Sequence, residues 1–77
     1  MEIVGNVVYV GAGNSVRGFN LKTGEMLMNV AIEGVLNIND VTADDKGNLY
    51  AGDVFGTKII KIRIKDNSYS VFVDGKG

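Results

Sequence analysis

Apolar and polar residues alternate along much of the chain with a period of two, which is the pattern of a β-strand with one buried face. The clearest example is residues 58–65, where isoleucines alternate with Lys61, Arg63 and Lys65. Residues 26–32 follow the same period, which favours a strand although several of their residue types also suit a helix. The isoleucines of the first stretch are predicted to face the core: Ile60, Ile62 and Ile64.

A hairpin is predicted over residues 37–53, at the centre of the chain. Val41 and Ala43 alternate there with polar residues, and a second apolar stretch, LYA, follows a few residues later. The intervening DDKGN concentrates residue types that tolerate turn geometry, and Gly47 is free to take a positive φ. We therefore interpret residues 37–53 as a strand, a tight turn and a second strand.

Three further short strands are predicted from apolar runs that are bounded by turn residues: 7–10, 16–21 and 69–73. Residues 22–25 (KTGE) join two of the strands as a hairpin turn. In total the sequence predicts seven strands and no helix, so the chain is expected to be all-β.

The strand pattern repeats once along the chain. Tyr9 and Tyr50 are 41 positions apart, and the glycines that precede them, Gly5 and Gly47, are 42 apart. A period of roughly 40 to 45 residues with four strands in each unit is typical of a β-propeller blade. The prediction is therefore antiparallel four-stranded blades, just under two in number. Residues 1–34 would form an incomplete first blade of three strands and residues 35–77 a complete second blade of four, because MEIV is too short to supply the missing strand convincingly.

The composition excludes several kinds of chemistry but does not identify a function. The 77 residues include no cysteine and no histidine, which excludes disulfides, thiolate metal sites and a histidine general base. The net charge of −1 gives no electrostatic reason to expect nucleic acid or an anionic membrane as a partner. The basic side chains of residues 58–65 are interpreted as a solvated strand face that discourages edge pairing. No targeting signal identifies a compartment.

Two parts of the chain resemble known propeller blades. NDVTADDKGNLYAGD, followed by KIIKI and VFVDG, resembles a blade of the six-bladed propellers of the gluconolactonase/regucalcin and NHL-repeat group. GNVVYVGAGNSVRGFNLKTGE is similar to blades of the quinoprotein type. The resemblance covers nearly the whole chain and implies propeller architecture, since the matching residues are mostly those of turns and packing.

The resemblance also implies a candidate metal site. In gluconolactonase-like propellers the Asn of an ND motif on an inner strand points into the central funnel and helps to bind a divalent metal or the substrate, and Asn39 and Asp40 stand at the matching place. Calcium is the implied cofactor, because it takes oxygen ligands such as an amide carbonyl. The remaining ligands of that family come from blades that this chain does not contain. The alternative is that Asn39 and Asp40 satisfy backbone groups of the turn and inner strand.

Fewer than two blades leave two large apolar faces in water, which a soluble monomer does not tolerate. Three arrangements stay open: a fragment of a larger protein, a small sandwich of two sheets, or self-association, in which three copies would supply the six blades of a closed ring. The function expected is a structural or assembly role with no activity of its own. The alternatives are a part of a divalent-metal-dependent lactonase or esterase, and a protein-binding propeller of the NHL type.

Overall fold

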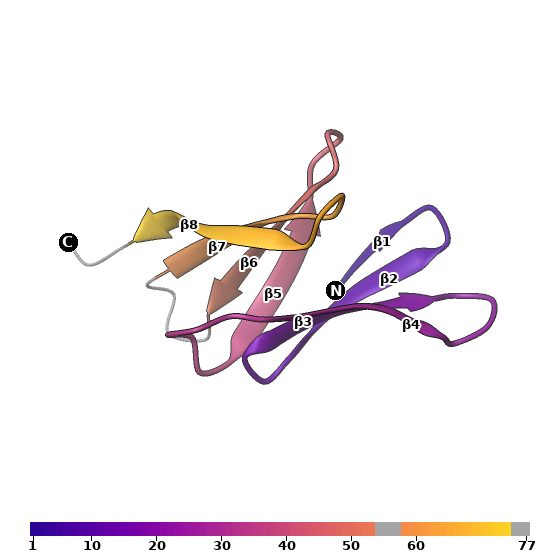
Figure 1. The fold of residues 1–77 in the computed structure, drawn as a ribbon, viewed down its shortest axis with the longest axis horizontal. Coiled ribbons are helices and arrows are strands. Elements are labelled where there is room, and N and C mark those ends of the chain that lie inside the picture. The colour runs from indigo at the N-terminus through magenta and orange to yellow at the C-terminus, as the bar shows by residue number, and fades with distance from the viewer. Residues whose placement is uncertain (54–57, 75–77) are drawn as a thin grey trace.

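The chain folds into two four-stranded antiparallel sheets (Figure 1). The computed structural model describes residues 1–53 and 58–74; residues 54–57 and 75–77, which belong to the predicted second blade, lie outside the described part. Sheet 1 contains, in order, β1 (Glu2–Val4), β2 (Val7–Ala12), β3 (Ser15–Asn20) and β4 (Met26–Ala31). Sheet 2 contains β5 (Ile38–Ala43), β6 (Asn48–Asp53), β7 (Lys58–Arg63) and β8 (Ser68–Asp74).

The all-β prediction is confirmed, because the described residues form strands and turns without a helix. The same residues accordingly contain no helix that is long and apolar enough to cross a membrane. Within each sheet the strands neighbour one another in sequence order, so both sheets are simple meanders, and the sheets do not close into a ring.

The predicted count of seven strands is one too few, because residues 2–4 form β1. This strand pairs with β2 in the register Glu2 to Tyr9, Ile3 to Val8 and Val4 to Val7. A turn at Gly5, with φ of 60°, closes the hairpin. Three residues are too few to show an alternation, so this strand is specified by its pairing partner rather than by its own pattern. Sheet 1 therefore has four strands where three were expected.

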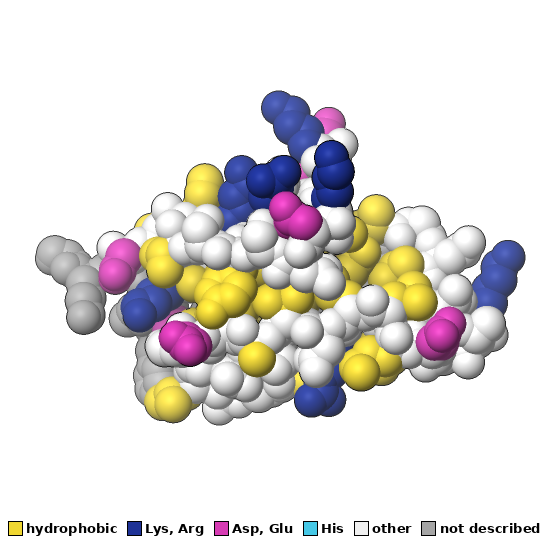
Figure 2. Space-filling view, viewed as in Figure 1, with side chains coloured by type: hydrophobic (Ala, Val, Ile, Leu, Met, Phe, Trp, Pro, Cys, Tyr) yellow, Lys and Arg dark blue, Asp and Glu magenta, His cyan; other side chains and the backbone are white. Residues whose placement is uncertain are grey.

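The core lies between the sheets, and Figure 2 shows hydrophobic side chains in a band that runs along the molecule between them. Strand β5 lies against β2, with β1 and β3 next to it. The buried apolar side chains come from both sheets and from their connection: Tyr9, Val16, Met28, Val30, Ile32, Val35, Ile38, Val41, Leu49, Ala51, Ile60 and Ile62.

The predicted inward face of β7 is confirmed for Ile60 and Ile62, which are 1% and 0% exposed. Ile64 follows the end of β7 and is only partly buried against the core. In β4 the period of two is also confirmed, since Met28 and Val30 are buried. Met26 is 52% exposed. The pairing of β3 with β4 shifts its register between Gly18 and Phe19, so Met26 pairs with Phe19 and does not lie on the same face as Met28.

The two sheets approach most closely at Gly11. A Cβ atom added there would lie 2.6 Å from Cγ2 and 2.9 Å from the carbonyl oxygen of Ile38, so only glycine allows β5 this near to β2. The N–H of Ile38 donates to the carbonyl oxygen of Gly13 at 2.7 Å, which ties the start of β5 to the β2–β3 turn. The position of sheet 2 on sheet 1 is therefore fixed by backbone contact as well as by side-chain packing.

Candidate functional site

The predicted metal residues lie on β5, at the edge of sheet 2. Asn39 and Asp40 are both exposed, and an irregularity in the pairing of β5 with β6 falls between Ile38 and Asp40. Oδ1 of Asp40 accepts a hydrogen bond from the N–H of Val41 at 2.9 Å and lies 3.9 Å from the N-terminal ammonium group. Because both charged groups are largely exposed, their attraction is weak.

Among residues 1–53 and 58–74, no three His, Cys, Asp or Glu side chains gather where they could hold a metal ion. Calcium takes six to eight oxygen ligands, and Asn39 and Asp40 would supply two of them. The metal site stays a prediction that would need further oxygen atoms from other parts of an assembly.

Asp44 forms the densest polar network of the described residues, at the turn between β5 and β6. Its carboxylate accepts hydrogen bonds from the N–H groups of Lys46 and Asn48, at 2.8 and 3.0 Å. It also accepts from Nδ2 of Asn48 at 2.9 Å and from the hydroxyl of Tyr50 at 3.1 Å. These donors, with the Asn48 side chain the strongest, lower the pKa of Asp44 to about 2.

This network has a structural rather than a ligand-binding role, since four donors already use the oxygens of Asp44. It fixes the hairpin that the sequence predicted, with Gly47 at a φ of 85°. It also holds Tyr50, whose pKa is raised by desolvation and further by the hydrogen bond to Asp44. The turn was predicted from residue types, whereas the reach of Asp44 to Tyr50, six residues away, was not.

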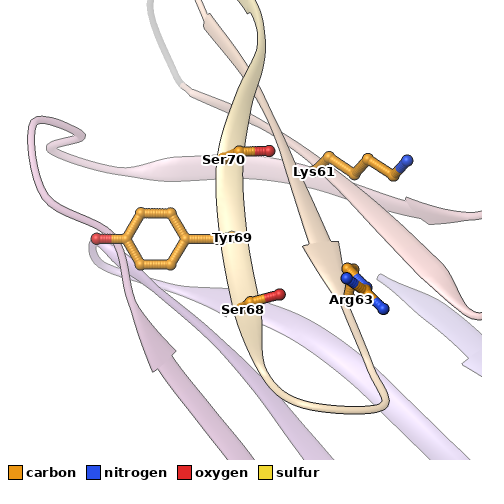
Figure 3. A pocket seen from close by; sticks show the side chains of 5 residues that line it. All are labelled: Lys61, Arg63, Ser68, Tyr69 and Ser70. Carbon is orange, nitrogen blue, oxygen red and sulfur yellow. The ribbon is translucent and has the colours of Figure 1, made fainter.

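A shallow hollow of about 230 Å³ lies over β7 and β8. Lys61 and Arg63 pair with Ser70 and Ser68 across the two strands, so the four side chains share one face of sheet 2 (Figure 3). Tyr69 also lines the hollow, but its ring points to the opposite side of the sheet, as Figure 3 shows. Figure 2 shows Lys and Arg side chains gathered along the upper side of the molecule.

The hollow offers hydrogen-bond donors to an anion, but the carboxylate of Asp66, in the turn between β7 and β8, already interacts with two of them. Oγ of Ser68 donates to Asp66 at 2.7 Å, and the guanidinium of Arg63 lies 3.9 Å from the same carboxyl group. The side-chain hydrogen bond from Ser68 is the main cause that lowers the pKa of Asp66. The hollow is therefore a solvated basic surface, as the sequence predicted. The predicted role of these side chains in discouraging edge pairing is wrong, because β7 is paired with strands on both sides.

Two outward faces remain beside the covered core, and the strand registers define them. The open face of sheet 1 contains side chains from β1 to β4: Ile3, Val8, Val10, Arg17, Phe19 and Asn29. The open face of sheet 2 contains side chains from β5 to β8: Asp40, Thr42, Tyr50, Ile59, Lys61, Arg63, Ser68 and Ser70. Gly52 lies between Asp40 and Ile59 on this face. Phe72 belongs to this second face, because its ring meets that of Tyr50 edge-on at 5.1 Å.

Both open faces carry exposed apolar side chains. On sheet 1, Ile3 is 52% exposed, and Met26 and Leu27 at the bulge beside Phe19 are 52% and 49% exposed. On sheet 2, Ile59 and Phe72 are 39% and 57% exposed. Such side chains are placed where another sheet could cover them.

The chain thus presents an open face on sheet 1 that is rich in apolar side chains, an open face on sheet 2 that is partly basic, and a turn fixed by Asp44. Its predicted metal residues are exposed on an edge strand. Comparisons of the chain with models of protein families, with curated proteins and with solved structures found no match.

Proposed function

We propose that the chain is an assembly unit, a pair of blade-like sheets that associates with further copies of itself through its two open faces. The observation that carries the proposal is the composition of β2. Its sequence VVYVGA is apolar toward both faces, although only the side of Tyr9 meets the other sheet.

A two-sheet sandwich that is complete on its own would turn polar side chains outward along each strand. On sheet 1, however, Val8 and Val10 of β2 face outward beside Ile3 and Phe19. A continuous apolar strand is the pattern of a strand that is buried on both faces. This supports an assembled state in which the open face of sheet 1 is covered.

The path of the chain supports the blade-like description. Each sheet is an antiparallel meander of four strands, and the connection from β4 leads to β5, which lies against the preceding sheet. Propellers repeat four-stranded meanders of this kind around an axis and need about four to eight of them. Two sheets are too few, so other copies would complete the arrangement, with three copies favoured for a ring of six sheets.

The concentration dependence of thermal unfolding tests this proposal. Association stabilises the folded chain by mass action, so the melting temperature should rise when the protein concentration increases about a hundredfold. The variant Lys46→Gln, in the exposed β5–β6 turn, should show the same dependence. A melting temperature that is independent of concentration, together with the mass of a single chain, would contradict the proposal.

A further inference from the structure

We infer that the copies associate head to tail, with the open face of sheet 1 of one copy covering the open face of sheet 2 of the next. The inference rests on the proposed self-association and specifies which two surfaces meet. Its basis is that the two sheets are structurally equivalent, and that the Tyr9 face of sheet 1 is already covered by sheet 2 within the chain.

Tyr9 and Tyr50 occupy equivalent positions in the two sheets. Each lies on the second strand of its sheet, and each is followed two residues later by a glycine, Gly11 or Gly52. Tyr9 is 5% exposed because sheet 2 covers its face, whereas the corresponding face around Tyr50 is open. The Tyr50 face of sheet 2 therefore corresponds in position to the face of sheet 1 that accepts another sheet, with Lys61 in the place of Gly18.

The two glycines show the difference directly. A Cβ atom on Gly11 would collide with Ile38 of β5, while a Cβ atom on Gly52 would have nothing within 4 Å. Gly52, near the end of β6, does not require a positive φ, so its backbone conformation does not explain a glycine at this position. A close approach of another backbone, as realised at Gly11, is one reason for a glycine at such a position; the irregular pairing of β5 opposite Gly52 is another.

The surface that covers the Tyr9 face of sheet 1 is the side of sheet 2 that carries Leu49 and Ala51. By the 41-residue offset of the repeat, the corresponding residues of sheet 1 are Val8 and Val10. These belong to the open face of sheet 1. A second copy thus carries the counterpart of the surface that already packs on a Tyr face within the chain, which identifies the occupant as another copy.

The basic residues of sheet 2 set the limits of this contact. Within the chain the closest approach is between β5 and β2, near the first strands of both sheets, rather than between the outer strands. Lys61 and Arg63 lie on β7, the third strand, and their long side chains can cover apolar surface while the charged groups remain in water. We place the centre of the contact on Gly52 and Ile59, with the basic hollow on one side of it and the exposed Asp40 of the edge strand β5 on the other.

A contact between two different faces is heterologous, so it generates a ring when its rotation closes. Contacts of a face with its own copy would instead be twofold, so a variant with one intact face would still form a dimer with itself. Single variants and their mixture distinguish these arrangements, because each variant removes one face and leaves the other intact.

The test uses Ile3→Glu, on the open face of sheet 1, and Ile59→Glu, on the open face of sheet 2. Both positions are substantially exposed in the single chain, so the fold should persist, which circular dichroism can verify. Native mass spectrometry should show each variant as a single chain. An equimolar mixture should give a dimer of one copy of each, because the intact face of sheet 2 of Ile3→Glu meets the intact face of sheet 1 of Ile59→Glu.

Lys46→Gln changes the net charge by the same amount as each variant, lies in a turn outside both faces, and should retain the wild-type mass. If Glu at either position unfolds the chain, Ile3→Gln and Ile59→Gln replace the pair. A wild-type assembly whose variants form no mixed dimer, or whose Ile3→Glu variant still dimerises alone, overturns the head-to-tail inference while self-association stands. A wild-type chain that is a single copy overturns the proposed function itself.

Discussion

The Tyr9 face of sheet 1 and the Tyr50 face of sheet 2 occupy equivalent positions, but only the first is covered by another sheet within the chain. The first is covered by β5; Gly11 allows the second sheet to approach, and Gly18 leaves room for the ring of Tyr9 within sheet 1. In the second, Lys61 stands opposite Tyr50 where Gly18 stands opposite Tyr9. Tyr50 is held instead by Asp44 and Phe72. A sheet face that is left open in the chain is thus kept ordered by local polar and aromatic contacts.

The difference teaches that the same repeat can be stabilised in two ways. In sheet 1, burial between sheets fixes Tyr9 and also raises its pKa. In sheet 2, hydrogen bonds within the β5–β6 hairpin fix Tyr50 without cover from another sheet. The predictions below test this contrast, beginning with the largest expected effect.

The two faces of β7 should respond very differently to truncation. Ile62→Ala removes a fully buried side chain and leaves a cavity, so it should cost about 2–5 kcal/mol in the free energy of unfolding. Lys61→Ala, on the open face, should change stability by less than about 0.5 kcal/mol. Urea denaturation of both variants measures the difference. Equal costs would mean that the open face is already packed.

The two equivalent glycines should also respond differently. Gly11→Val forces a side chain into Ile38 and should destabilise the chain by about 1–3 kcal/mol, the range of an overpacked core. The Cβ atom of Gly52→Val would have nothing within 4 Å, so this variant should leave stability unchanged or slightly higher, because valine suits a strand better than glycine does. Chemical denaturation at low protein concentration gives both values. A similar loss for both variants would remove the distinction between the covered and open faces.

Stability should depend on pH through the hairpin of the open face. The folded-state pKa of Asp44 is about 2, below its ordinary value of 3.8, so the carboxylate contributes stability above the ordinary value. This contribution is lost as pH falls through the interval from about 4 to about 2. Thermal unfolding should therefore show a smaller decrease over this interval for Asp44→Asn than for the wild type. Asp66, whose pKa is also lowered, remains in both proteins, so an identical decrease in both would exclude Asp44 as the source.

Calcium should have the smallest effect. Asn39 and Asp40 are exposed and supply too few oxygen ligands by themselves, so millimolar calcium should not change the melting temperature of the single chain. The predicted metal site would be supported instead by a rise in melting temperature that Asn39→Ala abolishes. That result would also favour the metal-dependent lactonase or esterase alternative over an assembly unit without activity. Lys46→Gln, which lies in an exposed turn outside both open faces, is the control.

Much of the fold could be predicted from sequence because the strands have a period of two and glycine-rich turns. The isoleucines of β7 and the turn at Gly47 followed directly from this pattern. Strand β1 did not, since three residues carry no readable period and their pairing with β2 decides their conformation. The exposure of Met26 was also unpredictable, because it depends on a bulge in the pairing of β3 with β4.

The functional surfaces were harder to predict than the strands. The sequence placed Gly11 and Gly52 at the ends of similar strands, but which of them receives another sheet depends on the packing of β5. The metal prediction for Asn39 and Asp40 came from a resemblance, and a ligand set cannot be read from two adjacent residues. The network of Asp44 depends on turn geometry that brings its carboxylate to Tyr50.

The native mass of the unmodified chain tests the central claim most directly, namely that the open faces are covered by other copies. The account predicts a discrete assembly, with three times the 8.2 kDa of one chain for a closed ring of six sheets. A single species of 8.2 kDa across the accessible concentration range would contradict it and leave the apolar open faces without a partner.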